Sequence, residues 1–252
     1  MTAEASAPHG LPHGPPHGPP HGLPYENVHA GAPAEARPLV TIAALYGAGG
    51  SVVGPAVATR LGVVFMGREI PLLAAGRSGA PPEAVAEVAE GERPLAERLR
   101  MDFGDASIIG AALARTSAEP AAATERRLRS CIEEFLVGAA THGGVLLGHG
   151  GMVVLRSVPW ALHVLLCGPS SERVRQAMAL QGQDRRTAEK RQRAEDRARI
   201  GYVRRAYGAD GLDPCWYHLI LDSTALTLDD CVEQIAAAAH ARLRKPRPSP
   251  PI

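Results

Sequence analysis

The chain has 252 residues, of which 45% are hydrophobic but only 4% aromatic, and its 27 Lys and Arg nearly balance its 26 Asp and Glu. A chain without an overall basic field is expected to bind neither nucleic acid nor an anionic membrane. A core of Ala, Val, Leu and Ile favours helices packed on a parallel sheet, and the length suffices for one domain of roughly 200 residues.

The chain begins with a repetitive segment. Residues 9–24 read HGLPHGPPHGPPHGLP, in which Gly and Pro disfavour both helix formation and a packed core. We therefore expect residues 1–37 to be a disordered tail, like the Pro-rich end at 244–252. Two interpretations of the repeat remain open: a linker without ligand, and a loose site for Ni²⁺, Zn²⁺ or Cu²⁺ formed by His9, His13, His17 and His21.

The four cysteines have no C-x-x-C spacing, which indicates neither a zinc site nor a redox pair. Buried thiols in a reducing compartment are expected instead. No apolar run of some 18 residues and no pattern typical of a secretion leader occurs, so we expect a cytoplasmic protein that does not enter a membrane. The cysteines are Cys131, Cys167, Cys215 and Cys231.

From residue 38 on, strand and helix patterns alternate. The run LVTIAAL predicts a buried strand that enters the glycine loop YGAGGS, followed by a helix that stops at Gly62. Because the alternation continues, we predict a three-layer α/β/α domain over 38–243 with a five-stranded parallel sheet. The predicted strands lie at 39–45, 63–66, 145–148, 161–167 and 217–222.

The segments between the strands predict helices. Residues 68–123 are charged, with broken helical periodicity, and indicate an inserted helical cap. An amphipathic helix follows, with Thr124 as its predicted N-cap, and the last helix, 227–243, opens at Thr227. The charged segment 170–207 is predicted to be helical throughout.

Three segments are candidates for a functional site. Gly47–Ser51 lies between a strand and a helix, where glycines let backbone N–H groups close around a phosphate, although a plain tight turn is equally compatible. The loop departs from G-x-x-x-x-G-K-[ST], because Ala44 stands for the first Gly and Gly50 for the Lys. Gly148, His149 and Gly150 follow another strand, where His149 is a turn residue, a donor to phosphate, or an acid or base.

The third candidate is the Arg-rich stretch 182–207, which is either a solvated helix face or a lid whose guanidinium groups neutralise phosphate charge. Helical spacing places four of its side chains on one face. They are Asp196, Arg199, Val203 and Tyr207.

Together these segments resemble the cytidylate kinase-like family over residues 38–240. VTIAALYGAGGSVVG is similar to the family's ITISREYGAGGSEIG, LLGHGG to a strand ending in GRG, and GREI (67–70) to D-R-E-I. The chain matches every specified position of the family's D-x-x-R-x-x-Y-x-R-R-x-Y-G. It departs from the family in the other motifs, where Ala43 and Ala44 replace Ser-Arg, Gly67 replaces Asp and His149 replaces Arg. The matched positions are Asp196, Arg199, Tyr202, Arg204, Arg205, Tyr207 and Gly208.

The resemblance implies a P-loop kinase fold and phosphoryl transfer from ATP-Mg²⁺ to a nucleoside monophosphate, CMP or a relative. Gly47, Ala48, Gly49, Gly50 and Ser51 would then cradle the donor, with the Ser51 hydroxyl on Mg²⁺. The acceptor would lie against Arg68, Gly148, His149 and Gly150, while Arg193 and Arg199 close from the lid, oriented by Asp196. Two alternatives stay open: a catalytically degenerate nucleotide-binding regulatory module, and a metal-binding role of the His-rich tail.

Overall fold

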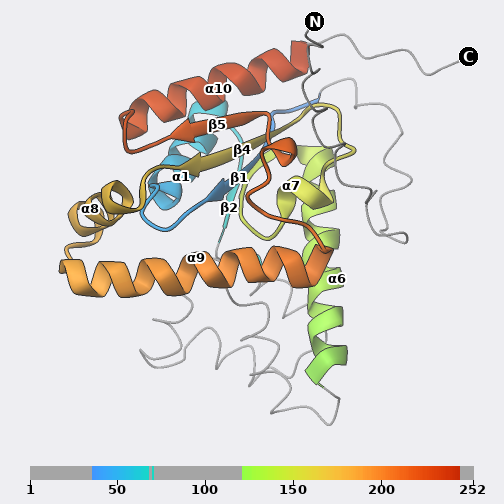
Figure 1. Cartoon of the computed structure of the whole chain (residues 1–252). Coiled ribbons are helices and arrows are strands. Elements are labelled where there is room, and N and C mark those ends of the chain that lie inside the picture. Colours follow the sequence, from blue (N-terminus) through green and yellow to red (C-terminus); the bar gives the residue numbers. More distant parts are fainter. Residues whose placement is uncertain (1–35, 68–69, 71–120, 245–252) are drawn as a thin grey trace, which may run out of the picture.

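The computed structural model describes residues 36–67, Ile70 and residues 121–244. Within them, five strands form one sheet in the order β2-β3-β1-β4-β5, in which every neighbouring pair is parallel. Helices cover both faces of the sheet (Figure 1), so the predicted α/β class with five parallel strands is confirmed. The strands are β1 (Leu39–Ala44), β2 (Phe65–Met66), β3 (Gly144–Leu147), β4 (Ala161–Cys167) and β5 (Leu219–Asp222). The helices are α1 (Gly50–Leu61), α6 (Ala121–His142), α7 (Gly151–Val154), α8 (Ser170–Gln181), α9 (Arg185–Tyr207), α10 (Leu228–Arg244) and the 3₁₀ turn η1 (Pro214–Trp216).

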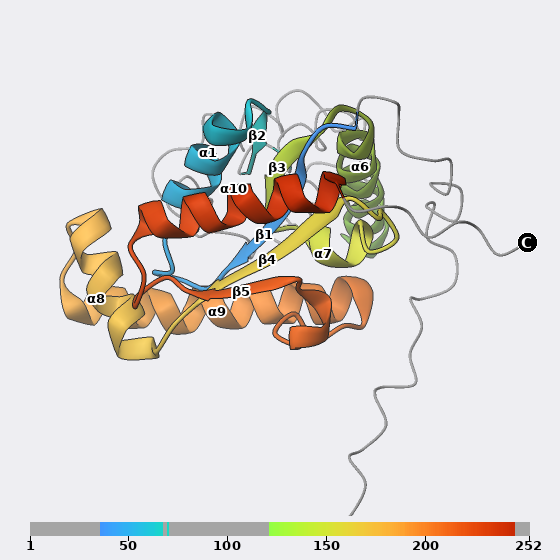
Figure 2. The ribbon, with the colours of Figure 1, turned by 90° about the horizontal axis from the view of Figure 1, so that it is seen from above.

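The two faces of the sheet carry different helices. Helices α1 and α10 lie together over one face, whereas α9 extends beneath the other, with α6 and α7 at its far end (Figure 2). Side chains of β1 alternate between the two cores: Val40 and Ile42 pack with the α1 and α10 side, and Leu39 with the α6, α7 and α9 side. Strands β1, β3 and β4 are buried on both faces of the sheet, which agrees with their nearly continuous apolar sequences.

Two predicted helix signals act as expected. Gly62 ends α1 in the left-handed conformation (φ 67°), and its N–H donates to the carbonyls of Ala58 and Thr59. Thr227 opens α10: its hydroxyl accepts a hydrogen bond from the Asp230 N–H (3.0 Å), while its own N–H donates to the Asp230 carboxylate (3.3 Å).

Three expectations are corrected. The charged segment 170–207 is not one helix, because Gly182 ends α8 and the Asp184 carboxylate accepts the Thr187 N–H (3.0 Å) to begin α9. Helix α6 starts at Ala121, so Thr124 lies inside it rather than at its N-cap. Cys215 is exposed, because it lies in the surface turn η1 rather than in the core.

Other expectations concern residues that the structure does not describe. The insertion at 68–123 is described only at Ile70 and the first residues of α6, and the tails only at residues 36–37 and Arg244. No helix in the described ranges combines the length and the apolar character needed to cross a bilayer.

A buried histidine, His163, lies in the middle of β4. Its Nδ1 is 2.8 Å from the Thr41 hydroxyl, and its ring stacks on His218 with the centroids 4.9 Å apart. Burial above all, with the charge on His218 and the cations Arg156 and Arg242 acting in the same direction, lowers the pKa of His163 to about 3. The protonated ring therefore does not fit the folded core at neutral or mildly acidic pH.

His163 is expected to make folding sensitive to acid. Since an unfolded histidine has a pKa of about 6.5, the unfolded chain gains a proton below that pH that the native chain rejects until about pH 3. The contribution of neutral His163 to the free energy of unfolding is therefore complete above pH 6.5 and falls by about 2 kcal/mol when the pH is lowered to 5. Urea denaturation at pH 8 and pH 5 measures the loss, and His163→Gln is expected to remove that part of it. Equal pH dependence in both proteins would contradict the assignment.

Candidate functional site

The two predicted loops, after β1 and after β3, meet at the carboxyl ends of the parallel strands. Strands β1 and β3 are neighbours, but β1 leads into α1 on one face and β3 leads into α7 on the other. In open α/β sheets the crevice between two such strands, beyond their carboxyl ends, is where ligands bind. The glycine loop (45–49) therefore lies beside the loop 148–150. Both are at the carboxyl ends of the strands, the same end of the sheet at which β4 leads into α8 (Figure 1).

The glycine loop leaves amide groups open at the start of α1. Gly49, the N-cap residue, has a φ of 77° and no side chain with which to cap the helix. Within the described residues, the N–H groups of Gly50 and Ser51 donate no hydrogen bond. Open amides at a helix N-terminus, reinforced by the helix dipole, form a site suited to an anion such as phosphate.

The loop has no room for a lysine where the usual phosphate-binding sequence has one. A Cβ atom on Gly50 would lie 2.6 Å from the Ala44 Cβ and 3.2 Å from a methyl group of Leu147. Any larger residue at position 50 would therefore displace β1 or β3. Positive charge for a phosphate has to come from another element.

Two pockets adjoin the glycine loop. The smaller one is bounded by the loop itself and by Gln181 of α8. The larger one lies between the sheet and α9, and its wall is mostly apolar, with Leu165, Ile200 and Val203 among its lining residues. Both pockets share a boundary formed by Ala44, Leu45 and Arg199.

Arg199 lies at the junction of the two pockets. Its side chain is 11% exposed, and its Nη1 is 4.0 Å from an Asp196 carboxylate oxygen. Of the described residues that line these pockets, Arg199 alone carries a permanent positive charge. A guanidinium in this place can face phosphate groups on both sides.

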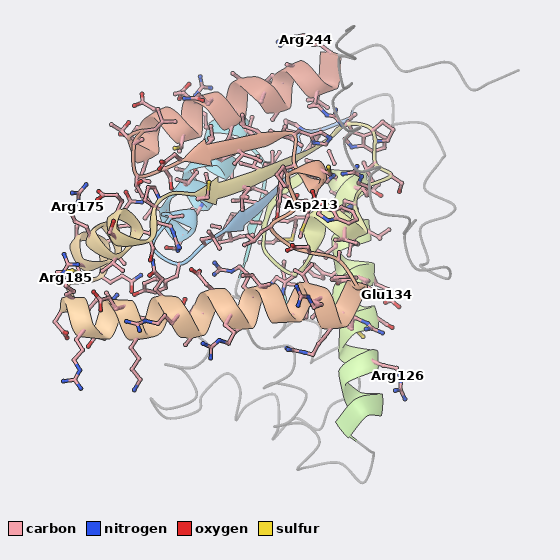
Figure 3. All side chains as sticks on the ribbon, viewed as in Figure 1. Arg126, Glu134, Arg175, Arg185, Asp213 and Arg244 are labelled. Atoms are coloured by element: carbon pink, nitrogen blue, oxygen red, sulfur yellow. The ribbon has the colours of Figure 1, made fainter. Side chains whose placement is uncertain are left out.

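The structure places Arg193 apart from the other candidate residues of α9. Its side chain is 73% exposed and 3.4 Å from Glu189, on the outer face of α9. The charged ends Arg175 and Arg185 likewise point away from the sheet (Figure 3). Arg193 therefore is not brought together with Asp196 and Arg199.

Asp196 connects α9 to the glycine loop. One carboxylate oxygen accepts the Tyr46 N–H (2.8 Å), and the other accepts from Nη1 of Arg173 (2.9 Å). The resemblance implies that Asp196 orients Arg193 and Arg199, whereas the short contacts of its carboxylate are with Arg173 and with the Tyr46 N–H. No pattern in the sequence indicates this role for Arg173, which lies on α8.

His149 is buried at 7% exposure, and it has a left-handed backbone conformation with a φ of 56°. Its Nε2 is 3.3 Å from the Gly67 carbonyl, and its own carbonyl accepts a hydrogen bond from the Tyr207 hydroxyl (3.3 Å). His149 thus links the loop after β3 to the end of β2 and to α9. It also lines the larger pocket together with Gly148 and Gly150.

Two sets of candidate residues lie outside the described residues. They are Arg68 and the tail histidines His9, His13, His17 and His21.

Comparison with known proteins bears on this arrangement. A model of the cytidylate kinase-like family matches residues 39–225, a span that contains both loops and α9. A crystal structure of an uncharacterized protein from Eubacterium ventriosum ATCC 27560 is similar with a TM-score of 0.57 and 13% identity, covering 81% of this chain and 99% of that one. Shikimate kinase from Acinetobacter baumannii in complex with shikimate has a TM-score of 0.43 and 15% identity, over 83% and 96% of the two chains. No curated protein matches the chain.

Proposed function

Because the chain belongs to the cytidylate kinase-like family, we propose that it transfers the γ-phosphoryl group of ATP to a nucleoside monophosphate such as CMP. The observation that carries this proposal is the open start of α1, which lies beside two pockets that share Arg199. Such a pair of pockets suits a reaction between two phosphate-bearing ligands. Family membership by itself supports a nucleotide kinase-like function.

The two pockets take different ligands in this proposal. The phosphates of ATP lie in the smaller pocket, against the amides of Gly49, Gly50 and Ser51. The acceptor lies in the larger pocket, with its phosphate toward Arg199. A phosphate oxygen of the acceptor attacks the γ-phosphorus while the bond to the β–γ bridging oxygen breaks, and ADP leaves with the electron pair. Arg199 neutralises the charge on the transferred group, and positioning supplies most of the remaining catalysis.

Mg²⁺ would enter with the nucleotide. Among the described residues there is no group of three or more His, Cys, Asp or Glu side chains that could hold a metal ion. Ser51 is the second residue of α1, is exposed, and lines the smaller pocket, so its hydroxyl fits a single ligand to an ion held mainly by phosphate oxygens and water. The ion would supply further charge neutralisation there.

The larger pocket offers its ligand few polar groups. The Tyr217 hydroxyl donates to the Gly211 carbonyl (2.5 Å), and burial raises the pKa of Tyr217, so it stays neutral and cannot act as a base. The remaining wall is largely apolar and would contact the base and sugar rather than the phosphate.

Ser51→Ala is expected to lower turnover about tenfold at limiting Mg²⁺ and to raise the Mg²⁺ concentration needed for half-maximal rate, because one oxygen ligand is lost. ADP formation from ATP across a panel of nucleoside monophosphates, measured as Mg²⁺ is varied, tests both the activity and this role. Ser157→Ala, at an exposed serine in the turn after α7, is the matched control. No acceptor-dependent ADP formation by the wild-type chain would refute the kinase proposal.

A second candidate function is a regulatory module that binds nucleotide without transferring phosphate. The observation that favours it is His149, which stands where the family has an arginine. The His149 ring lies within hydrogen-bonding distance of the Gly67 carbonyl, so it contacts the protein at a position where an arginine would be able to bind phosphate. An ATP-dependent rise in melting temperature without ADP formation would favour this candidate.

A further inference from the structure

The carbonyl oxygens of the glycine loop are held by three side chains. The Tyr46 carbonyl accepts from Nη1 of Arg173 (2.7 Å), the Gly47 carbonyl from Nε2 of Gln176 (3.0 Å), and the Ala48 carbonyl from the Ser223 hydroxyl (2.8 Å). Arg173 and Gln176 come from α8, and Ser223 from the loop after β5. Three consecutive peptide groups are thus fixed in orientation by elements far away in the chain.

The orientation of these carbonyls determines where the amides point. Across a planar trans peptide, the C=O and the following N–H point in opposite directions. Holding the carbonyls of Tyr46 and Ala48 toward α8 and the β5–α10 loop therefore turns the N–H groups of Gly47 and Gly49 the other way. The Ala48 N–H, which follows the Gly47 carbonyl, donates to the Leu45 carbonyl (2.9 Å) and closes the turn.

The holding side chains are themselves fixed. The Arg173 side chain is 8% exposed and also donates to the Gly168 carbonyl (3.0 Å) and to Asp196 (2.9 Å). Ser223 is fully buried, and its N–H donates to the Cys167 carbonyl (3.1 Å). Gln176 is half-buried against the loop. Such an arrangement keeps the loop in one shape before any ligand arrives.

We propose that Arg173, Gln176 and Ser223 are positioning residues for the donor phosphates: they keep the loop's three carbonyl oxygens away from the pocket, and the N–H groups of Gly47 and Gly49 are thereby directed into it. This inference rests on the proposed function, because it assumes that phosphate binds at this loop. Without these donors, a carbonyl is free to rotate toward the ligand, where its partial negative charge opposes phosphate. The three residues act through the loop backbone and need no contact with the nucleotide.

Gln176→Met and Ser223→Ala test the proposal, since each removes one donor with little change in shape. Arg173 is unsuitable, because its loss also leaves Asp196 without its buried partner. In the full chain, each variant is expected to bind inorganic tripolyphosphate about fivefold more weakly by titration calorimetry, and the double variant about 25-fold. In turnover assays, the KM for ATP is expected to rise by similar factors while the KM for the acceptor stays within about twofold. Gln234→Met, on the exposed face of α10, is the control.

The outcomes separate the two proposals. Loss of thermal stability or of kcat with unchanged tripolyphosphate affinity would show a structural role only and overturn the inference, while the proposed function stands. A wild-type chain that binds neither tripolyphosphate nor ATP would overturn both. Weaker binding of tripolyphosphate and ATP alike, at unchanged acceptor KM, is the result that we expect.

Discussion

Replacing Arg199 by methionine is expected to lower the rate of phosphoryl transfer by about a hundred- to a thousandfold. Arg199 is the residue that borders both pockets and carries a permanent charge, and the glycine loop cannot supply a lysine because Gly50 packs against Ala44. In the proposed reaction, the charge that develops on the transferred group would be neutralised by Mg²⁺ and, among the described residues that line the pockets, by this guanidinium. The loss is expected in kcat more than in the KM for ATP, since the interaction strengthens in the transition state.

Steady-state rates for Arg199→Met and for Arg197→Met measure this effect. Arg197 lies on the exposed side of the same helix and lines neither pocket, so its variant is expected to keep its activity within about twofold. Unfolding by urea shows whether both variants fold. Equal activity of a folded Arg199→Met protein and the wild type would remove Arg199 from the mechanism.

Gly47→Ala is expected to destabilise the domain by about 3 kcal/mol, or to lower its melting temperature by about 10 °C. Two causes act together. Gly47 has a φ of 77°, which costs alanine about 1–2 kcal/mol, and a Cβ atom there would lie 2.1 Å from the Arg173 carbonyl oxygen. Because that oxygen belongs to the backbone of α8, no side-chain rotation relieves the contact.

Gly182→Ala separates the two causes. Gly182 has a similar φ of 63°, but a Cβ atom on it would meet nothing within 4 Å. Its variant is expected to lose only the conformational part, about 1 kcal/mol. Thermal unfolding of both proteins measures the difference in stability. Equal decreases in melting temperature would show that α8 moves away from the added methyl group without loss of stability.

Local patterns in the sequence predict most of the fold. Apolar runs identify all five strands, with β4 predicted at the bounds that it has, and the signals at Gly62 and Thr227 identify helix ends. In these segments the tertiary contacts, strand pairing and burial, favour the same secondary structure as the local propensity of the residues. The boundary between α8 and α9 was missed, because the charged pattern on both sides of Gly182 is alike and hides the turn.

The candidate site was only partly predictable. The glycine loop and Arg199 are identified as candidates by composition and spacing, although a tight turn and a solvated helix face are equally compatible with these patterns. The contacts of Arg173, Gln176 and Ser223 with the loop join residues more than about 100 positions apart in the chain, and they follow no periodicity that a sequence displays. The outward turn of Arg193 likewise depends on which face of α9 packs against the sheet.

The position of β1 in the sheet has a consequence for the newly made chain. Both neighbours of β1 come from segments that follow it by about 100 residues, because Leu39 pairs with Gly144 on one side and with Ala161 on the other. At ribosomal rates of about 5–20 residues per second, the apolar segment Leu39–Ala44 is made about 5–20 s before the two strands that flank it in the folded sheet. Its exposed backbone edges can pair with other chains during that time. Nascent chains that stop before residue 144 are therefore expected to associate with holding chaperones, and release is expected once β4 has left the ribosome.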